Sequence, residues 1–103
     1  MADPNRPPHT TGHASEFYMA CREGDIDRVN RYLKSMTKRE VDLIEESNRS
    51  TALHAASYHG HSEVVKRLLE LGASTHTRNG YGYTAEQEAG NQATKDVFAK
   101  FKK

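Results

Sequence analysis

The clearest pattern of apolar and polar positions lies in the middle of the chain. It predicts a helix from about Ser62 to Leu71, with apolar positions at i, i+1, i+4 and i+5 on one face: Val64, Val65, Leu68 and Leu69. Thr51 is placed to cap a preceding helix that ends at Gly60, and Gly72 ends the second helix. Two helices this short cannot bury an apolar face alone, so neighbouring units must cover it.

The same pattern recurs on both sides of this helix pair. The pair Thr51-Ala52 recurs 33 positions later as Thr84-Ala85, and a shift of 36 positions carries 20–24 onto 56–60. The chain therefore divides into a domain over 14–103 that contains three units, at about 14–36, 48–78 and 79–101.

The middle unit carries a specific family pattern. Its residues resemble an ankyrin repeat at Thr51-Ala52-Leu53-His54-Ala55-Ala56, Gly60-His61, Val64-Val65, Leu68-Leu69 and Gly72-Ala73. The resemblance implies an all-α solenoid of three antiparallel helix pairs, joined by protruding β-hairpin-like loops. Four positions depart from the pattern: Arg49 stands where the family usually has Gly, Ala52 and Ala85 where it has Pro, and Ser74 where it has Asp.

The helices of the first unit have recognisable ends. Ser15 is placed to cap a helix that ends at Gly24, and Asp25 to cap a second helix over about 26–34. The connection that follows is long, and Thr37 and Glu40 have the spacing of a capping box. We expect a short extra helical turn there, with Leu43 or Ile44 packed on the stack. This turn could determine binding specificity, or it could only act as a spacer between the first two units.

The last connection carries the clearest turn chemistry. Asn79-Gly80 is a tight-turn pair, and it predicts a hairpin-like loop that presents Tyr81 and Tyr83. A last helix is expected over about 94–101, with Thr94 as its cap and three inward apolar residues: Val97, Phe98 and Phe101.

Composition adds bounds rather than a function. The chain has 103 residues and a formal net charge of +1, so it lacks the strong charge that would attract nucleic acid or a membrane surface. No apolar run is long enough to cross a bilayer. A single cysteine, Cys21, cannot form an internal disulfide, which favours the cytoplasm or the nucleus. Residues 1–13 contain Pro4, Pro7 and Pro8 and predict a flexible leader, with a docking peptide as the alternative.

Several side chains invite a chemical interpretation that the spacing does not support. His54, His59 and His61 lie close in sequence, but a structural zinc site needs four ligands and usually cysteines. Cys21 falls on the packing face of its helix, where a small apolar residue belongs. We therefore predict no catalytic residue, no cofactor and no metal.

The resemblance also implies a binding surface. In the ankyrin family, the first helices and the loop tips line a concave groove. The repeat register makes three pairs of helix positions equivalent, and the loop tips add four residues: Arg22-Glu23, Tyr58-His59 and Asn91-Gln92, with Asn48, Ser50, Tyr81 and Tyr83. We predict that Tyr58, Tyr81 and Tyr83 form one exposed aromatic patch, with His59 and Arg22 at its polar rim. Packing of Tyr58 against a neighbouring helix, or of Tyr83 over an adjacent loop, is the structural alternative.

Three classes of function follow. The first is a monomeric, non-catalytic protein–protein interaction module, an adaptor or regulatory subunit that binds another protein through this groove. The second is a targeting or regulatory arm of a larger enzyme, such as a ubiquitin ligase or an ADP-ribosyltransferase. The third and weakest is a nucleic-acid binder, because the lysines of 95–103 favour a solvated helix face over a binding patch.

Overall fold

The computed structural model describes residues 15–42 and 49–101, and these form three consecutive helical units. The helices are α1 (Glu16–Glu23), α2 (Ile26–Leu33), α3 (Lys38–Val41), α4 (Ala52–Tyr58), α5 (Ser62–Glu70), the 3₁₀ helix η2 (Glu86–Glu88) and α6 (Gln92–Lys100). No strand occurs within these two ranges. The expected all-α class is confirmed.

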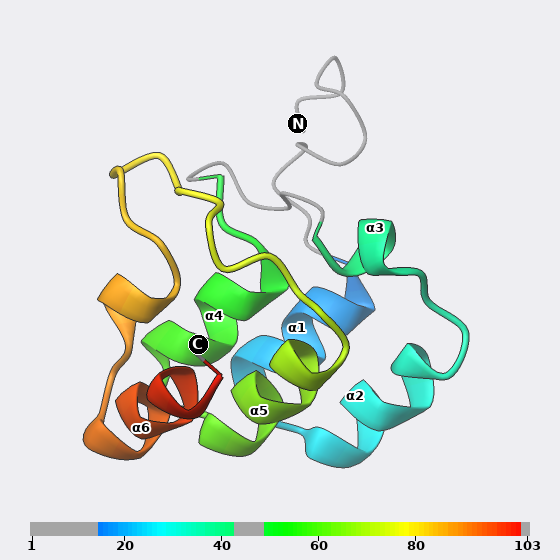
Figure 1. The fold of residues 1–103 in the computed structure, drawn as a ribbon. Helices are drawn as coiled ribbons and strands as arrows, with labels where there is room; N and C mark the ends of the chain where they lie inside the picture. The colour runs from blue at the N-terminus through cyan, green and yellow to red at the C-terminus, as the bar shows by residue number, and fades with distance from the viewer. Residues whose placement is uncertain (1–14, 43–48, 102–103) are drawn as a thin grey trace.

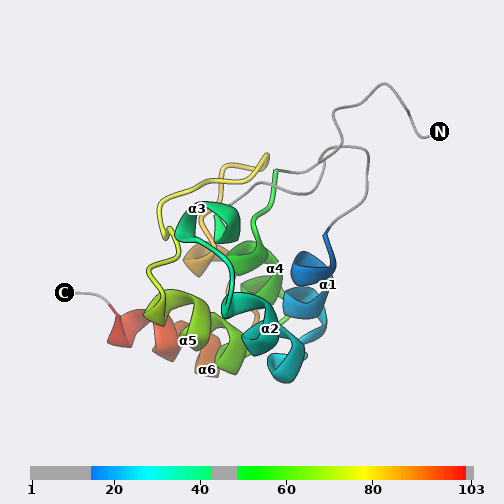
Figure 2. The ribbon, with the colours of Figure 1, turned by 90° about the vertical axis from the view of Figure 1, so that its right-hand side faces the viewer.

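The helices lie in two rows (Figures 1 and 2). α1, α4 and η2 form one row, which we call the inner row, and α2, α5 and α6 form the outer row. Each helix contacts its neighbour in the same row, and α1–α2 and α4–α5 also pack as pairs. This is the contact pattern of a repeat solenoid, in which each unit touches only the next.

The helix ends follow the local rules that the sequence predicts. The Ser15 side chain accepts a hydrogen bond from the Tyr18 N–H at 3.1 Å, and Asp25 accepts one from the Arg28 N–H at 3.2 Å. Gly24 ends α1 in the left-handed conformation, with φ of 76°. These caps satisfy backbone groups that short helices would otherwise leave unpaired.

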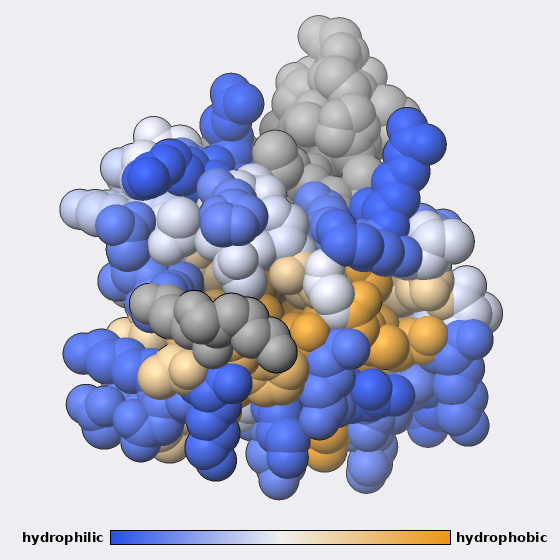
Figure 3. Space-filling model, viewed as in Figure 1, coloured by the Kyte–Doolittle hydropathy of each residue, from blue (hydrophilic) through white to orange (hydrophobic). Residues whose placement is uncertain are grey.

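The core lies between the two rows. Leu68 is fully buried and Leu69 is 7% exposed, as predicted for the middle unit. The outer surface is polar, since Figure 3 shows hydrophilic residues along the outer helices and an apolar band between them and the loops. Glu63 and Lys66 on α5 are among the exposed residues of this surface. The inward prediction for Phe101 is wrong, because it ends α6 and is 38% exposed.

The third unit departs from the predicted register. α1 and α2 precede α4 and α5 by 36 residues, as expected, but α6 begins at Gln92, only 30 residues after α5 begins at Ser62. The 33-residue shift matches Val64 with Val97; this prediction is wrong, because Thr94 occupies the equivalent buried position. Asn91, and not Thr94, caps this helix.

The three missing positions come from the first helix of the third unit. Thr84 and Gln87 start it correctly, each bonding the other's backbone N–H through its side chain. The helix nevertheless ends after the single 3₁₀ turn η2, because Gly90 donates its N–H to the Ser57 carbonyl of α4 at 2.8 Å. That bond draws the chain against α4 before a second turn can form.

A methyl group at Gly90 should therefore destabilise the fold. A Cβ there would overlap the backbone carbonyl oxygen of Tyr58 at the end of α4, and a backbone atom cannot rotate away. We expect Gly90→Ala to cost about 1–3 kcal/mol, the usual range for overpacking. Chemical denaturation of the two proteins measures the difference, and identical unfolding midpoints would contradict this contact.

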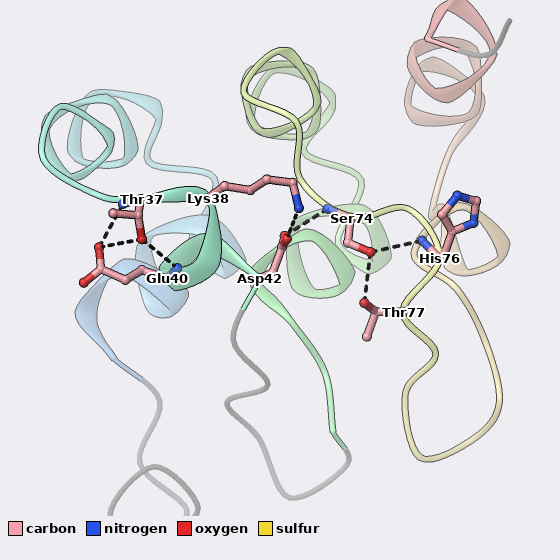
Figure 4. Close-up of polar contacts among 7 residues, drawn as sticks. All are labelled: Thr37, Lys38, Glu40, Asp42, Ser74, His76 and Thr77. Atoms are coloured by element: carbon pink, nitrogen blue, oxygen red, sulfur yellow. Dashed lines mark hydrogen bonds and ion pairs between the residues drawn. The ribbon is translucent and has the colours of Figure 1, made fainter.

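The long connection between the first two units contains α3, as the capping box predicts. The Thr37 side chain accepts from the Glu40 N–H, and the Glu40 side chain accepts from the Thr37 N–H at 2.8 Å. Asp42 then joins this turn to the next loop, accepting from Lys38 Nζ at 2.6 Å and from the Ser74 N–H at 2.9 Å (Figure 4). Leu43 and Ile44, expected to pack here, lie outside the described residues.

Arg49, which stands where the family usually has Gly, keeps the backbone conformation that a glycine would adopt. Its φ is 67°, and Gly82, at the equivalent position 33 residues later, has φ of 87°. Both units thus use the same left-handed backbone, which costs a residue with a Cβ about 1–2 kcal/mol.

Arg49→Gly should stabilise the protein. Relief of the backbone strain exceeds the extra entropy of glycine in the unfolded chain, so we expect a net gain of roughly 0.5–1 kcal/mol. Thermal or chemical melting of Arg49→Gly beside Arg49→Ala makes the test. The alanine variant loses the same side chain but keeps the Cβ, so equal stability of the two variants would disprove the explanation.

Candidate functional site

A groove with a volume of about 400 Å³ opens on the inner helix row. α1, α4, η2 and the two loops above them supply its lining residues: Tyr18, Arg22, Ser50, His54, Ala55, Tyr58, His59, Tyr81 and Glu88. Five of the predicted partner-binding residues therefore meet at one site: Arg22, Ser50, Tyr58, His59 and Tyr81.

His54 forms a rigid part of the groove floor. It is 2% exposed, and its Nδ1 accepts from the Thr51 N–H at 3.3 Å, so the ring proton lies on Nε2. Nε2 then donates to the Tyr83 carbonyl at 2.9 Å. This histidine thus ties the middle unit to the following loop, and both its nitrogens are already used.

Aromatic side chains rise from the end of α4 to form one wall. Tyr58 is 62% exposed, and its ring meets His59 edge-on with the ring centroids 5.2 Å apart. His59 lies nearly parallel to His61 at 6.2 Å, and His61 donates through Nε2 to the Arg22 carbonyl at 2.9 Å. The structural alternative, in which Tyr58 packs against a neighbouring helix, is therefore wrong for this side chain.

The loop that carries Tyr81 is held by Asn79. The Asn79 side-chain oxygen accepts from the backbone N–H groups of Tyr81 (2.9 Å) and Tyr83 (3.1 Å). The Asn79 backbone N–H donates to the Tyr83 carbonyl at 2.9 Å. The predicted tight turn at Asn79-Gly80 is present, because the Gly82 N–H donates to the Asn79 carbonyl at 3.0 Å, and Gly82 is the left-handed residue that follows. The loop is thus closed by backbone bonds at its base and by the Asn79 side chain within it.

The two loop tyrosines have different surroundings. Tyr81 is 70% exposed and lines the groove, whereas Tyr83 is 50% exposed and does not. The predicted patch is therefore present for Tyr58 and Tyr81, with Arg22 and His59 beside them, and Tyr83 lies apart from it.

Other predicted residues lie outside the groove. Glu23 points instead to Arg28, with 3.8 Å between their charged atoms. Asn91 and Gln92 start the outer helix α6, so their predicted equivalence with Tyr58-His59 is wrong; the cause is the shortened third unit. The Asn91 side chain bonds the Thr94 N–H and the Gly60 carbonyl, and Gln92 bonds Asp96.

The loop before α4 also differs from expectation. Ser50 lines the groove, but it is only 5% exposed and is not a free loop tip. Asn48, its predicted companion, lies outside the described residues.

Four lining residues were missed from the sequence, and the repeat register could have found them. Tyr18 and His54 are equivalent under the shift of 36, as are Arg22 and Tyr58, while Glu88 follows Ala55 by 33. Every helical lining residue except His59 thus belongs to one of three repeat positions. His54 and Ala55 are buried, and a buried side chain gives no sign in the sequence that it lines a groove.

The described residues show no metal-binding cluster and no membrane-spanning helix. In the part of the chain that the structure describes, no three His, Cys, Asp or Glu residues gather where they could hold a metal ion. Over the same residues, no helix has the length and apolar character needed to cross a bilayer.

Comparison with known families decides the classification. A family model described as three copies of the ankyrin repeat matches residues 17–97. The chain belongs to the ankyrin-repeat family. The stacked helix pairs, the left-handed glycines at helix ends and the threonine–histidine capping box of α4 are thus features of ankyrin repeats.

Several curated ankyrin-repeat proteins are similar in sequence. Protein phosphatase 1 regulatory subunit 27 from Mus musculus is 38% identical over 63 residues, which is 61% of this chain and 40% of that protein. Ankyrin repeat domain-containing protein 17 from Homo sapiens is 47% identical over 45 residues, 44% of this chain and 2% of that protein. The chain thus spans less than half the length of either relative.

A solved structure supports the fold. The ankyrin repeat domain of human ASB11 superposes with a TM-score of 0.71 at 24% identity, covering 84% of this chain and 39% of that one. This likeness concerns the fold alone.

Proposed function

We propose that this ankyrin-repeat chain is a non-catalytic adaptor or regulatory subunit that binds another protein through the groove on its inner helix row. Ankyrin repeats mark a protein–protein interaction module. The observation that carries the proposal is the pair Tyr58 and Tyr81, two tyrosines more than half exposed and brought to one groove from different units. The core does not need them there, and tyrosine is enriched among residues that dominate binding energy.

The groove is organised in advance of any partner. Asn79 fixes the backbone that carries Tyr81, and His54 fixes that loop to α4. A partner would therefore lose little free energy in ordering the site, because binding is tighter when the bound geometry already exists.

One relative supports the regulatory role within this class. Its name makes it a regulatory subunit of a protein phosphatase, and the match includes 61% of the present chain. We propose the same kind of role here, in a monomer of the cytoplasm or the nucleus, without assigning the enzyme it would regulate.

Site-specific photo-crosslinking tests the proposal. A benzophenone amino acid replaces Tyr81 in the groove or, as a control, Lys66 on the outer helix α5, which is also exposed. We expect irradiation in cells to yield a discrete crosslinked species from position 81 and not from position 66. Crosslinks from position 66 alone would show that partners bind the outer surface.

In a second candidate function, the same groove belongs to a larger protein. The similar proteins extend far beyond the matched region, which favours the groove serving as one arm of a longer chain; a larger enzyme is one such chain. Sequencing of the transcript beyond the codon for Lys103 distinguishes a single small protein from such an arm.

A further inference from the structure

The walls of the groove carry side chains that can donate hydrogen bonds to a ligand. Among the bonds formed within 15–42 and 49–101, none uses the guanidinium of Arg22 or the hydroxyls of Tyr58 and Tyr81. Among the described lining residues, Glu88 is the one carboxylate. A guanidinium only donates and a tyrosine hydroxyl can donate, so a ligand that presents carbonyl oxygens can bond this wall.

The floor adds contact area without free polar atoms. Both ring nitrogens of His54 are bonded, and Ala55 beside it is apolar and 5% exposed. The ligand therefore needs an apolar surface toward the floor and acceptors toward the rim.

Three common modes of peptide recognition compete for such a groove. A β-strand binds by pairing with a sheet edge, and the described residues contain no strand. An amphipathic helix needs a continuous apolar groove, whereas tyrosine hydroxyls and two charged residues rim this one. A polyproline II segment docks on aromatic rings, has apolar side chains and leaves its carbonyls free, since proline has no N–H.

We infer that the groove binds a proline-rich segment of a partner protein in the polyproline II conformation. The inference rests on the proposed function and names the chemistry of the partner. Tyr58, His59 and Tyr81 supply the ring surface, and Arg22 and the tyrosine hydroxyls donate to the carbonyls of the segment.

The charges give the segment a direction and a length. Arg22 lies on α1 and Glu88 on η2, and these two helices flank α4 on opposite sides (Figure 1). Two helix spacings of about 8–10 Å separate them, which corresponds to about six residues at the polyproline rise of about 3.1 Å. The segment carries a basic residue at the end that meets Glu88.

Synthetic peptides test this directly on the full chain. Fluorescein-labelled peptides of nine prolines with one arginine, placed at either terminus, are titrated by fluorescence anisotropy against a glycine–serine peptide of equal length and charge. We expect one proline peptide to bind at least tenfold more tightly than the glycine–serine control. Tyr58→Ala and Glu88→Gln should each weaken it about tenfold, and Lys66→Ala should leave it unchanged.

A charge swap guards against a general loss of folding. Glu88→Arg should reject the arginine peptide but bind a matched peptide in which glutamate replaces the arginine. Equal affinity for the glycine–serine control, or no saturable binding of either proline peptide to the unaltered protein, overturns the inference.

The chain's own prolines provide the competing occupant. Binding that appears only after Pro4, Pro7 and Pro8 are changed to alanine would assign the groove to segment 1–14 and overturn its assignment to a partner. Failure of the peptides while Tyr81 still crosslinks to a protein in cells would reject this inference alone and leave the proposed function standing.

Discussion

Leu68→Ala is expected to destabilise the chain by about 2–5 kcal/mol, the range for a fully buried leucine. Leu68 has no exposed surface, and its helix α5 contacts the helices of all three units. Small domains are stable by only about 5–15 kcal/mol, so the variant loses a large share of its stability. Denaturant unfolding followed by circular dichroism measures the loss.

Leu71→Ala is the matched control for this change. It is the same substitution at the end of the same helix, but Leu71 is 41% exposed. We expect it to alter stability by no more than about 0.5 kcal/mol, as is usual for surface positions. Similar losses in the two variants would contradict the assignment of Leu68 to the core between units.

Joint replacement of Tyr58 and Tyr81 by alanine is expected to weaken partner binding by more than about 2 kcal/mol, the usual scale of a binding hot spot. That corresponds to roughly a thirtyfold rise in Kd. Because both side chains are mostly exposed in the free protein, the melting curve should change little. Calorimetric titration of the crosslinked partner, once identified, gives the affinity.

Tyr83→Ala provides a sharp comparison for the tyrosine pair. Tyr83 lies on the same loop as Tyr81 and is half exposed, but it does not line the groove. It should affect binding much less than Tyr81→Ala, and Glu63→Ala on the outer row should have no effect. Binding that survives the double variant but is lost on Glu63→Ala would move the site to the outer surface.

Sequence alone predicts the features whose causes are local. The caps at Ser15, Asp25 and Thr51 depend on side chains that reach a backbone N–H three residues away, so spacing is sufficient to find them. The repeat register between the first and second units is also predictable, because both units keep a complete helix pair.

The remaining features depend on contacts between distant residues. The third unit is shortened because Gly90 bonds to Ser57, 33 residues earlier, and no local signal at Gly90 announces that partner. Likewise, Arg22 and Glu23 are neighbours on one helix, but only Arg22 is among the described residues that line the groove, while Glu23 lies 3.8 Å from Arg28. The candidate site was therefore predictable as a surface but not as a residue list.

The connection that contains α3 has a consequence for how such chains vary in length. The entropy of closing a loop grows only with the logarithm of its length, so the three residues by which this connection exceeds the 33-residue period cost little free energy. Asp42 offsets part of that cost by bonding the connection to Ser74. Insertions and deletions at this connection should therefore accumulate among relatives faster than elsewhere in the stack, and they would change the outline of the loop surface while the helix rows keep their positions.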